Sequence, residues 1–88
     1  MSWVYRFDAR ALKDIKKLGH PAQKEILRYL DERVAGVGDP RRFGKGLKAD
    51  LAGLWRYRVG DYRILWQIRD RELAVLAVAV GHRRNIYM

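Results

Sequence analysis

Arg56, Arg58 and Arg63 are the residues of this chain whose type and spacing are best suited to chemistry. An arginine presents a planar fork that bonds phosphate oxygens in pairs, and it keeps its charge throughout the physiological pH range. Residues 81–88 add further cations together with an imidazole and a phenol. We interpret these groups as a phosphate site. The plainer alternative is a basic face that is simply solvated.

Two segments with strand-like alternation, 55–59 and 62–69, must position these arginines. Gly60-Asp61 between them is a two-residue hairpin signal, with glycine suited to the first central position of a type II′ turn. The turn places Arg58 opposite Arg63, and alternation puts Arg56 on the same face. Like charges directly opposite each other destabilise a sheet by about 0.2–1 kcal/mol, so this pair favours an anionic ligand. The other face carries Trp55, Tyr57, Ile64 and Trp66.

The rest of the chain supplies a small α+β frame of order β-α-α-β-β-β. After a strand at 3–7, Asp8 is a fitting N-cap for a helix through Leu18, and Pro21 suits the start of a second helix. Helical spacing assigns two apolar stripes to the core, one of Ala11, Leu12, Ile15 and Leu18, the other of Ile26, Leu27, Leu30, Val34 and Val37. A loop at 39–52 and strands at 54–59, 62–69 and 73–80 follow. We expect one small, twisted, mainly antiparallel sheet with the two-helix hairpin on one face.

Size and composition restrict the class of protein. The 88 residues make one domain, and 49% hydrophobic residues are enough for a single core. The absence of cysteine excludes disulfides and thiolate metal sites, and with only two histidines we expect neither a metal nor a cofactor. No signal-peptide region opens the chain, and the longest apolar run is too short to cross a membrane. We therefore expect a cytoplasmic protein.

The positive charge is concentrated in the second half of the chain. The net charge is +9, and residues 41–88 contribute 11 basic against 4 acidic side chains. This asymmetry indicates a polyanionic partner, RNA before a membrane, although an acidic protein satisfies the same argument. The candidates for RNA contacts around the arginines are Arg41, Arg42, Lys45, Lys48 and Arg84.

The predicted sheet face that carries the arginines becomes apolar toward its last strand. Leu65 should lie near Leu76 or Val78, and the sequence offers nothing further to cover them. A contiguous exposed apolar area usually marks an interaction surface. The three residues are thus candidates for contact with a protein partner.

Three segments carry a resemblance to the RelE/ParE superfamily of bacterial toxins, and within it to the RelE-type members. They are residues 5–13 (YRFDARALK), 53–64 (GLWRYRVGDYRI) and 80–87 (VGHRRNIY), in the right order and over essentially the whole chain. The resemblance implies the toxin of a type II toxin–antitoxin system. Such a toxin cleaves mRNA in the ribosomal A site and is silenced by a cognate antitoxin, a small and partly disordered protein with an acidic segment.

The resemblance also implies roles for the tail. It places Arg83 and Tyr87 where RelE-type members act on the reacting groups, and it shows Arg56 and Arg58 standing where the best-known members have lysines. A phenol becomes a base only if a strongly cationic site lowers its pKa, ordinarily about 10. An imidazole is a better proton donor near neutral pH than a guanidinium, so His82 competes with Arg83 for that role.

Alternatives remain open from the sequence. Residues 81–88 could be a disordered basic tail, since termini fray. A ParE-like inhibitor of DNA gyrase would share the fold and the antitoxin but would need no acid or base beside the arginines. A non-catalytic module that binds nucleic acid together with its antitoxin is the third possibility.

Overall fold

A computed structural model describes residues 2–86 of the chain. The elements are, in chain order, β1 (Val4–Phe7), α1 (Ala9–Lys17), α2 (His20–Arg33), η1 (Pro40–Phe43), β2 (Lys45–Gly46), η2 (Ala49–Leu51), β3 (Trp55–Val59), β4 (Tyr62–Arg69), η3 (Asp70–Glu72) and β5 (Ala74–His82), where η marks a 3₁₀ helix. The α+β class is as predicted, and so is the order of the two helices and the four longer strands. None of the helices in this described part has the length and apolar character needed to cross a membrane.

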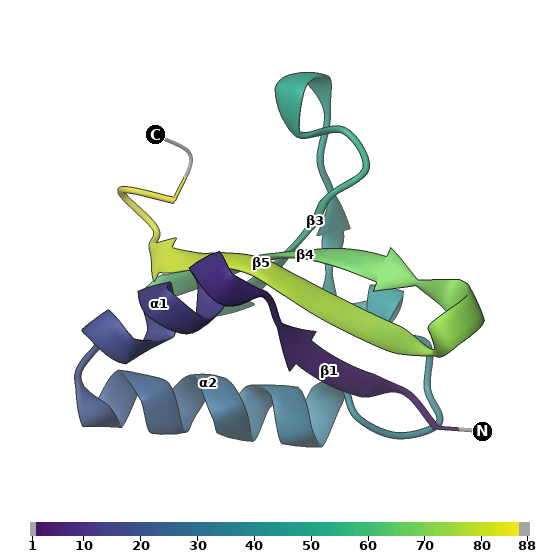
Figure 1. Ribbon diagram of the computed structural model, residues 1–88, viewed down its shortest axis with the longest axis horizontal. Helices are drawn as coiled ribbons and strands as arrows, with labels where there is room; N and C mark the ends of the chain where they lie inside the picture. Colours follow the sequence, from purple (N-terminus) through teal and green to yellow (C-terminus); the bar gives the residue numbers. More distant parts are fainter. Residues whose placement is uncertain (1, 87–88) are drawn as a thin grey trace.

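The strands form one five-stranded sheet in the order β1-β5-β4-β3-β2. β1 runs parallel to β5, and the other pairs are antiparallel, so the sheet is mainly antiparallel as expected. Figure 1 shows both helices on one side of the sheet, with the turn between β2 and β3 and the C-terminal tail projecting from the other side. We call that second side the open face.

The hairpin between β3 and β4 has the predicted register. Arg58 pairs with Arg63, and Val59 pairs with Tyr62. Gly60 has φ +60°, whereas Asp61 is not among the residues with positive φ, which is the pattern of a type II′ turn. A Cβ at this position would lie 2.7 Å from the Glu25 carboxylate, the end of an exposed and flexible side chain, so the positive φ is what calls for glycine here.

The core lies between the helices and one face of the sheet. Ile26 and Leu30 of α2 pack with Tyr57, Ile64 and Trp66 of the hairpin, and all five are essentially inaccessible to water. The rings of Tyr57 and Trp66 stack with centroids 4.2 Å apart. The prediction that the aromatic face of the hairpin meets the helices is therefore confirmed.

The prediction of burial is wrong for three residues of the apolar stripes. Leu12 is 43% exposed, Leu27 is 38% exposed, and Val37 is 82% exposed. Val37 fails because α2 ends at Arg33, so the later residues no longer follow helical spacing. In α1 only Ala11 and Ile15 are buried, which is a narrower stripe than the periodicity suggested. The N-cap is confirmed, because the Asp8 side chain accepts the backbone N–H of Ala11 at 2.9 Å.

The region expected to be a loop contains the short strand β2. Lys45 pairs with Arg56 and Gly46 pairs with Trp55. A strand of two residues shows no alternation that sequence could reveal, and its flanking glycines and Pro40 indicate a loop. β2 nevertheless matters, because it adds Lys45 to the sheet.

Tyr5 joins β1 to α2, and this contact makes stability depend on pH. Its hydroxyl donates to the Asp31 carboxylate at 2.6 Å, and burial together with that bond and the Asp31 charge raises the pKa of Tyr5 from 10.0 to about 12. Between those values the unfolded chain loses the proton and the folded chain keeps it, so stability falls as pH rises through this window. We expect Tyr5→Phe to lose about 1 kcal/mol near neutral pH and to flatten that decline. Urea unfolding at pH 7 and across the alkaline window would show it, and an unchanged alkaline slope would contradict the assignment.

Candidate nucleic-acid interface

Cations from three adjacent strands lie in two rows across the open face. Residues paired directly across a sheet point to the same side. In the first row Lys45 pairs with Arg56, and the row continues through Leu65 to Ala79. In the second row Arg58 pairs with Arg63, which pairs with Gly81. The register therefore brings the three predicted arginines together and adds Lys45, which sequence analysis had placed in a loop.

Arg63 is buried, although it stands on the same face of the sheet as the exposed Arg58. Only 8% of the residue is exposed, and one guanidinium nitrogen donates to the carbonyl oxygens of Gly60 at 3.0 Å and Tyr62 at 2.8 Å. Its charge thus lies beneath the site while the side chain holds the hairpin turn. Arg58 in the neighbouring strand is exposed.

Arg63→Ala should therefore destabilise the fold, where a side chain lying open would have cost little. The variant loses two hydrogen bonds and leaves a space where the buried side chain packed, so the free energy of unfolding should fall by about 1–3 kcal/mol. Arg84→Ala is a suitable control, because Arg84 is exposed and its backbone, not its side chain, makes the recorded bond. Equal midpoints of urea unfolding for both variants would contradict a structural role for Arg63.

The C-terminal tail comes back onto the hairpin turn. The Arg83 N–H donates to the Asp61 carbonyl at 2.8 Å, and the Arg83 Nε lies 3.9 Å from the Asp61 carboxylate. Two further N–H groups, of Asn85 and Ile86, donate to the His82 carbonyl and close a tight turn. The tail therefore lies beside the Gly60-Asp61 turn, and Arg83 is held next to the residues that join Arg58 to Arg63.

His82 points away from the arginines. It pairs with Tyr62, so its side chain shares the face of Tyr62, which packs against the core on the helix side. Its ring meets the Tyr62 ring edge-on at 6.0 Å, and its Nδ1 accepts the N–H of Arg84 at 3.3 Å. This placement is a correction to the idea that His82 donates a proton at the arginine face. Tyr87, the candidate base, lies outside the described residues.

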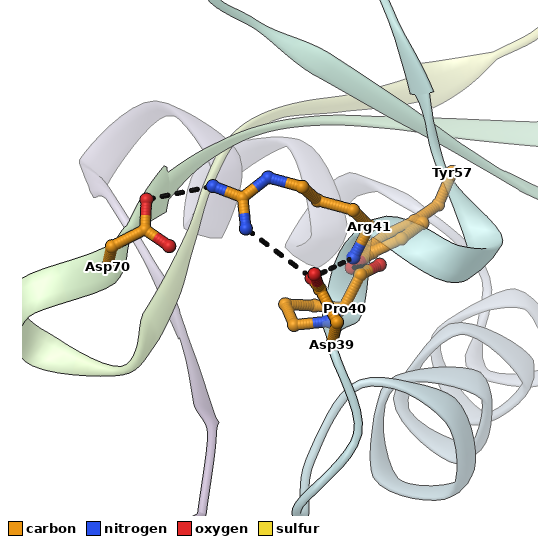
Figure 2. A network of polar contacts seen from close by, with 5 residues as sticks. All are labelled: Asp39, Pro40, Arg41, Tyr57 and Asp70. Carbon is orange, nitrogen blue, oxygen red and sulfur yellow. Dashed lines mark hydrogen bonds and ion pairs between the residues drawn. The ribbon is translucent and has the colours of Figure 1, made fainter.

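Arg41, a predicted RNA contact, is engaged within the protein. Its guanidinium bonds Asp39 at 3.4 Å and Asp70 at 2.8 Å, which ties η1 to the end of β4, and the bond to Asp70 raises the pKa of Arg41 (Figure 2). Beside it the Tyr57 hydroxyl donates to the Pro40 carbonyl, and burial raises the pKa of Tyr57, so this phenol stays protonated. The other predicted RNA contacts are all exposed: Arg42, Lys45, Lys48 and Arg84.

The apolar part of the open face is covered more fully than the sequence suggested. Leu65 is only 5% exposed, because Ile86 of the tail packs on it and on Ala79, with Leu54 alongside. Its partner in the register is Ala79, while Leu76 lies further along, opposite Gln67. The expectation that nothing in the chain covers this patch was wrong, since the tail folds back over it.

A hollow of about 430 Å³ remains next to this cover. Leu51 and Leu54 line one side, Val78 and Gln67 lie in the sheet, and Ile86 borders it from the tail. Val78 and Leu76 are half-buried. Leu65, which lines the hollow, also stands in the first row beside Arg56, so an apolar surface lies next to that cation, a combination that fits a partner with both apolar and anionic groups.

The face can bind phosphate and stabilise charge that develops on it. Arg56 and Arg58 lie on this face of the sheet, and Arg83 is held in the tail beside the hairpin turn. Among residues 2–86 no three side chains of the metal-binding types lie together. The cations are therefore the groups of the described chain that can neutralise an anion at this place.

Comparison with known proteins shows the family of this chain. Residues 5–87 match the family model described as the ParE toxin of a type II toxin–antitoxin system. Toxin RelG of Mycobacterium tuberculosis is 36% identical, over 99% of this chain and 98% of its own, and the mRNA interferase toxin RelE of Escherichia coli is 29% identical, over 97% and 87%. The RelBE2 toxin–antitoxin complex of Mycobacterium tuberculosis contains a chain of TM-score 0.80 and 29% identity, with 97% of this chain and 95% of that one covered.

Proposed function

This chain belongs to the RelE/ParE superfamily of type II toxin–antitoxin toxins, and we propose that it acts as an endoribonuclease that cleaves mRNA in the ribosomal A site. The observation that carries the proposal is that the register of the sheet groups Lys45, Arg56, Arg58 and Arg63 on one face. Arg83 of the tail is held at the turn that joins Arg58 to Arg63, through its contacts with Asp61.

RNA supplies its own nucleophile for this reaction. The 2′-oxygen forms a bond to the adjacent phosphorus, the bond from phosphorus to the 5′ oxygen of the next nucleotide breaks, and a cyclic phosphate remains. The protein must align the attack, remove the 2′ proton and return a proton to the leaving 5′ oxygen. It must also stabilise the added charge on the phosphorane, a role we assign to Arg56 and Arg58, with Arg63 contributing charge from below.

Proton transfer falls to the tail. The position of His82 on the helix side leaves Arg83 as the described candidate for protonating the leaving oxygen. We assign removal of the 2′ proton to Tyr87, on the strength of its match to the tail of RelE-type members. A cationic environment would favour the phenolate form of such a group.

We further propose that a cognate antitoxin silences the toxin by binding the open face. Chains similar to this one have been solved as toxin–antitoxin complexes. The hollow beside Ile86 offers apolar contacts, and the adjacent cations favour an acidic segment. An antitoxin bound there would cover Arg56 and Arg58 and so exclude RNA.

Inhibition of DNA gyrase is the second candidate function, because the matching family model is that of the ParE toxin. The two functions are separated by a single pair of assays on the purified chain. Primer extension on mRNA from a translation extract should reveal new 5′ ends at codon positions within the reading frame, while gyrase supercoiling stays unaffected. Intact mRNA together with inhibited supercoiling would reverse the assignment.

A further inference from the structure

The outer surface of α1 carries a second group of cations that the proposed active site does not use. The four side chains, all exposed, are Arg10, Lys13, Lys16 and Lys17. With Ala11 and Ile15 buried against the sheet, helical geometry places the cations on one continuous arc. Residues 10 and 17 are separated by about 10 Å along the helix axis.

One acidic side chain lies on this helix, and it is turned inward. Asp14 accepts the backbone N–H of Val80 at 3.0 Å, where β5 runs beyond the end of β1, and it lies 4.0 Å from the Arg10 Nε. Its carboxylate therefore satisfies a backbone N–H at the edge of the sheet. The outer surface of α2 differs, because Glu25, Asp31 and Glu32 alternate there with the cations.

The cations of α1 lie across a hollow from the tail. The hollow has a volume of about 440 Å³ and is lined by Arg10 and Lys17 on the helix and by His82 and Asn85 on the tail. Figure 1 shows α1 and the tail at the same end of β5, with the η3 turn at the other end. A polyanion that leaves the arginine face past Arg83 and Arg84 would meet α1 next.

We infer that the outer face of α1 is a second RNA contact, which binds the phosphodiester backbone away from the cleaved bond. The inference rests on the proposed function and deepens it, because it names where the RNA continues. Lysines at helical spacing suit this role, since a flexible point charge neutralises phosphates without reading bases. The backbone belongs either to the mRNA itself or to ribosomal RNA, and both present the same chemistry.

A charge-reversal pair tests the inference. Lys13→Glu/Lys17→Glu changes two exposed cations of α1, and Lys24→Glu/Arg71→Glu makes the same change in net charge on α2 and η3. Binding of the full chain to a single-stranded RNA oligonucleotide and to small ribosomal subunits should be measured at several salt concentrations. We expect the α1 variant to bind at least about tenfold more weakly, with a salt slope lower by about 0.7 per lost single-strand phosphate contact.

The probe that responds identifies the source of the backbone. Weaker binding of the oligonucleotide indicates mRNA, whereas weaker binding of ribosomal subunits alone indicates ribosomal RNA, and either result supports the inference. Equally weak RNA binding by the two variants would show that only net charge matters and would overturn the inference. Loss of antitoxin binding with unchanged RNA binding would overturn it as well.

The readout is independent of catalysis. A wild-type chain that binds RNA and does not cleave mRNA would refute the proposed nuclease while the comparison of variants still decides the role of α1. A wild-type chain that cleaves, with an α1 variant that binds RNA equally well, would refute the inference alone.

Discussion

Arg58→Ala is expected to lower the rate of mRNA cleavage about a hundred- to a thousand-fold and to leave the fold intact. Arg58 is exposed on the open face, in line with Arg63, so its loss removes a charge beside the phosphorane. Removing one preorganised donor from such a site typically raises the barrier by about 3–4 kcal/mol. The rate should be measured as single-turnover cleavage of mRNA on programmed ribosomes.

Arg58→Ala should lower the cleavage rate but raise the free energy of unfolding. The substitution also removes the repulsion between Arg58 and Arg63, which face each other directly, so unfolding should become harder by about 0.2–1 kcal/mol. Arg71→Ala is a matched control, since Arg71 is an exposed arginine in η3 at the far end of the sheet. Full activity in Arg58→Ala would remove the phosphate-binding interpretation of this face.

The sequence was sufficient to predict the part of the site that depends on local rules. Gly60-Asp61 dictates a two-residue turn, and a two-residue turn dictates that Arg58 pairs with Arg63. The alternation of Trp55, Tyr57 and Trp66 then decides which face meets the core. These inferences hold because register and period are properties of a few neighbouring residues.

What the sequence could not predict depends on contacts between distant segments. Nothing local shows that Ile86 folds back onto Leu65, or that the Arg63 guanidinium turns to the carbonyls of its own hairpin. Lys45 joins the cation rows through a two-residue strand that has no detectable period. The side of the sheet on which His82 lies follows from its pairing with Tyr62, which in turn depends on where β5 ends.

The placement of α1 illustrates the same limit for charges. Four cations within eight residues are visible in the sequence, whereas the inward turn of Asp14 toward Val80 is visible only in the fold. The charge difference between the halves of the chain does not reveal this helix, because acidic residues elsewhere in residues 1–40 balance its cations.

Val78→Glu is expected to produce a toxin that its antitoxin no longer silences. Val78 borders the hollow on the open face and is half-buried, whereas Leu65, another of the predicted contacts, is too deeply buried to test a surface contact. A carboxylate at this place would be trapped without a partner in the complex and would repel an acidic segment. Such a change typically weakens an interface by about 3–5 kcal/mol.

Two controls are needed, one for the added charge and one for folding of the isolated chain. Val37→Glu introduces the same charge at a residue that is 82% exposed and lies outside the hollow, so binding should hardly change. The affinity for the antitoxin should be measured by titration calorimetry, with mRNA cleavage by the same preparation as proof of an intact site. Part of the loss should persist at high salt, because the trapped charge is shielded from ions while contacts at the rim are not. An active Val78→Glu chain with wild-type affinity would place the antitoxin on another surface, and the hollow would then need a different occupant.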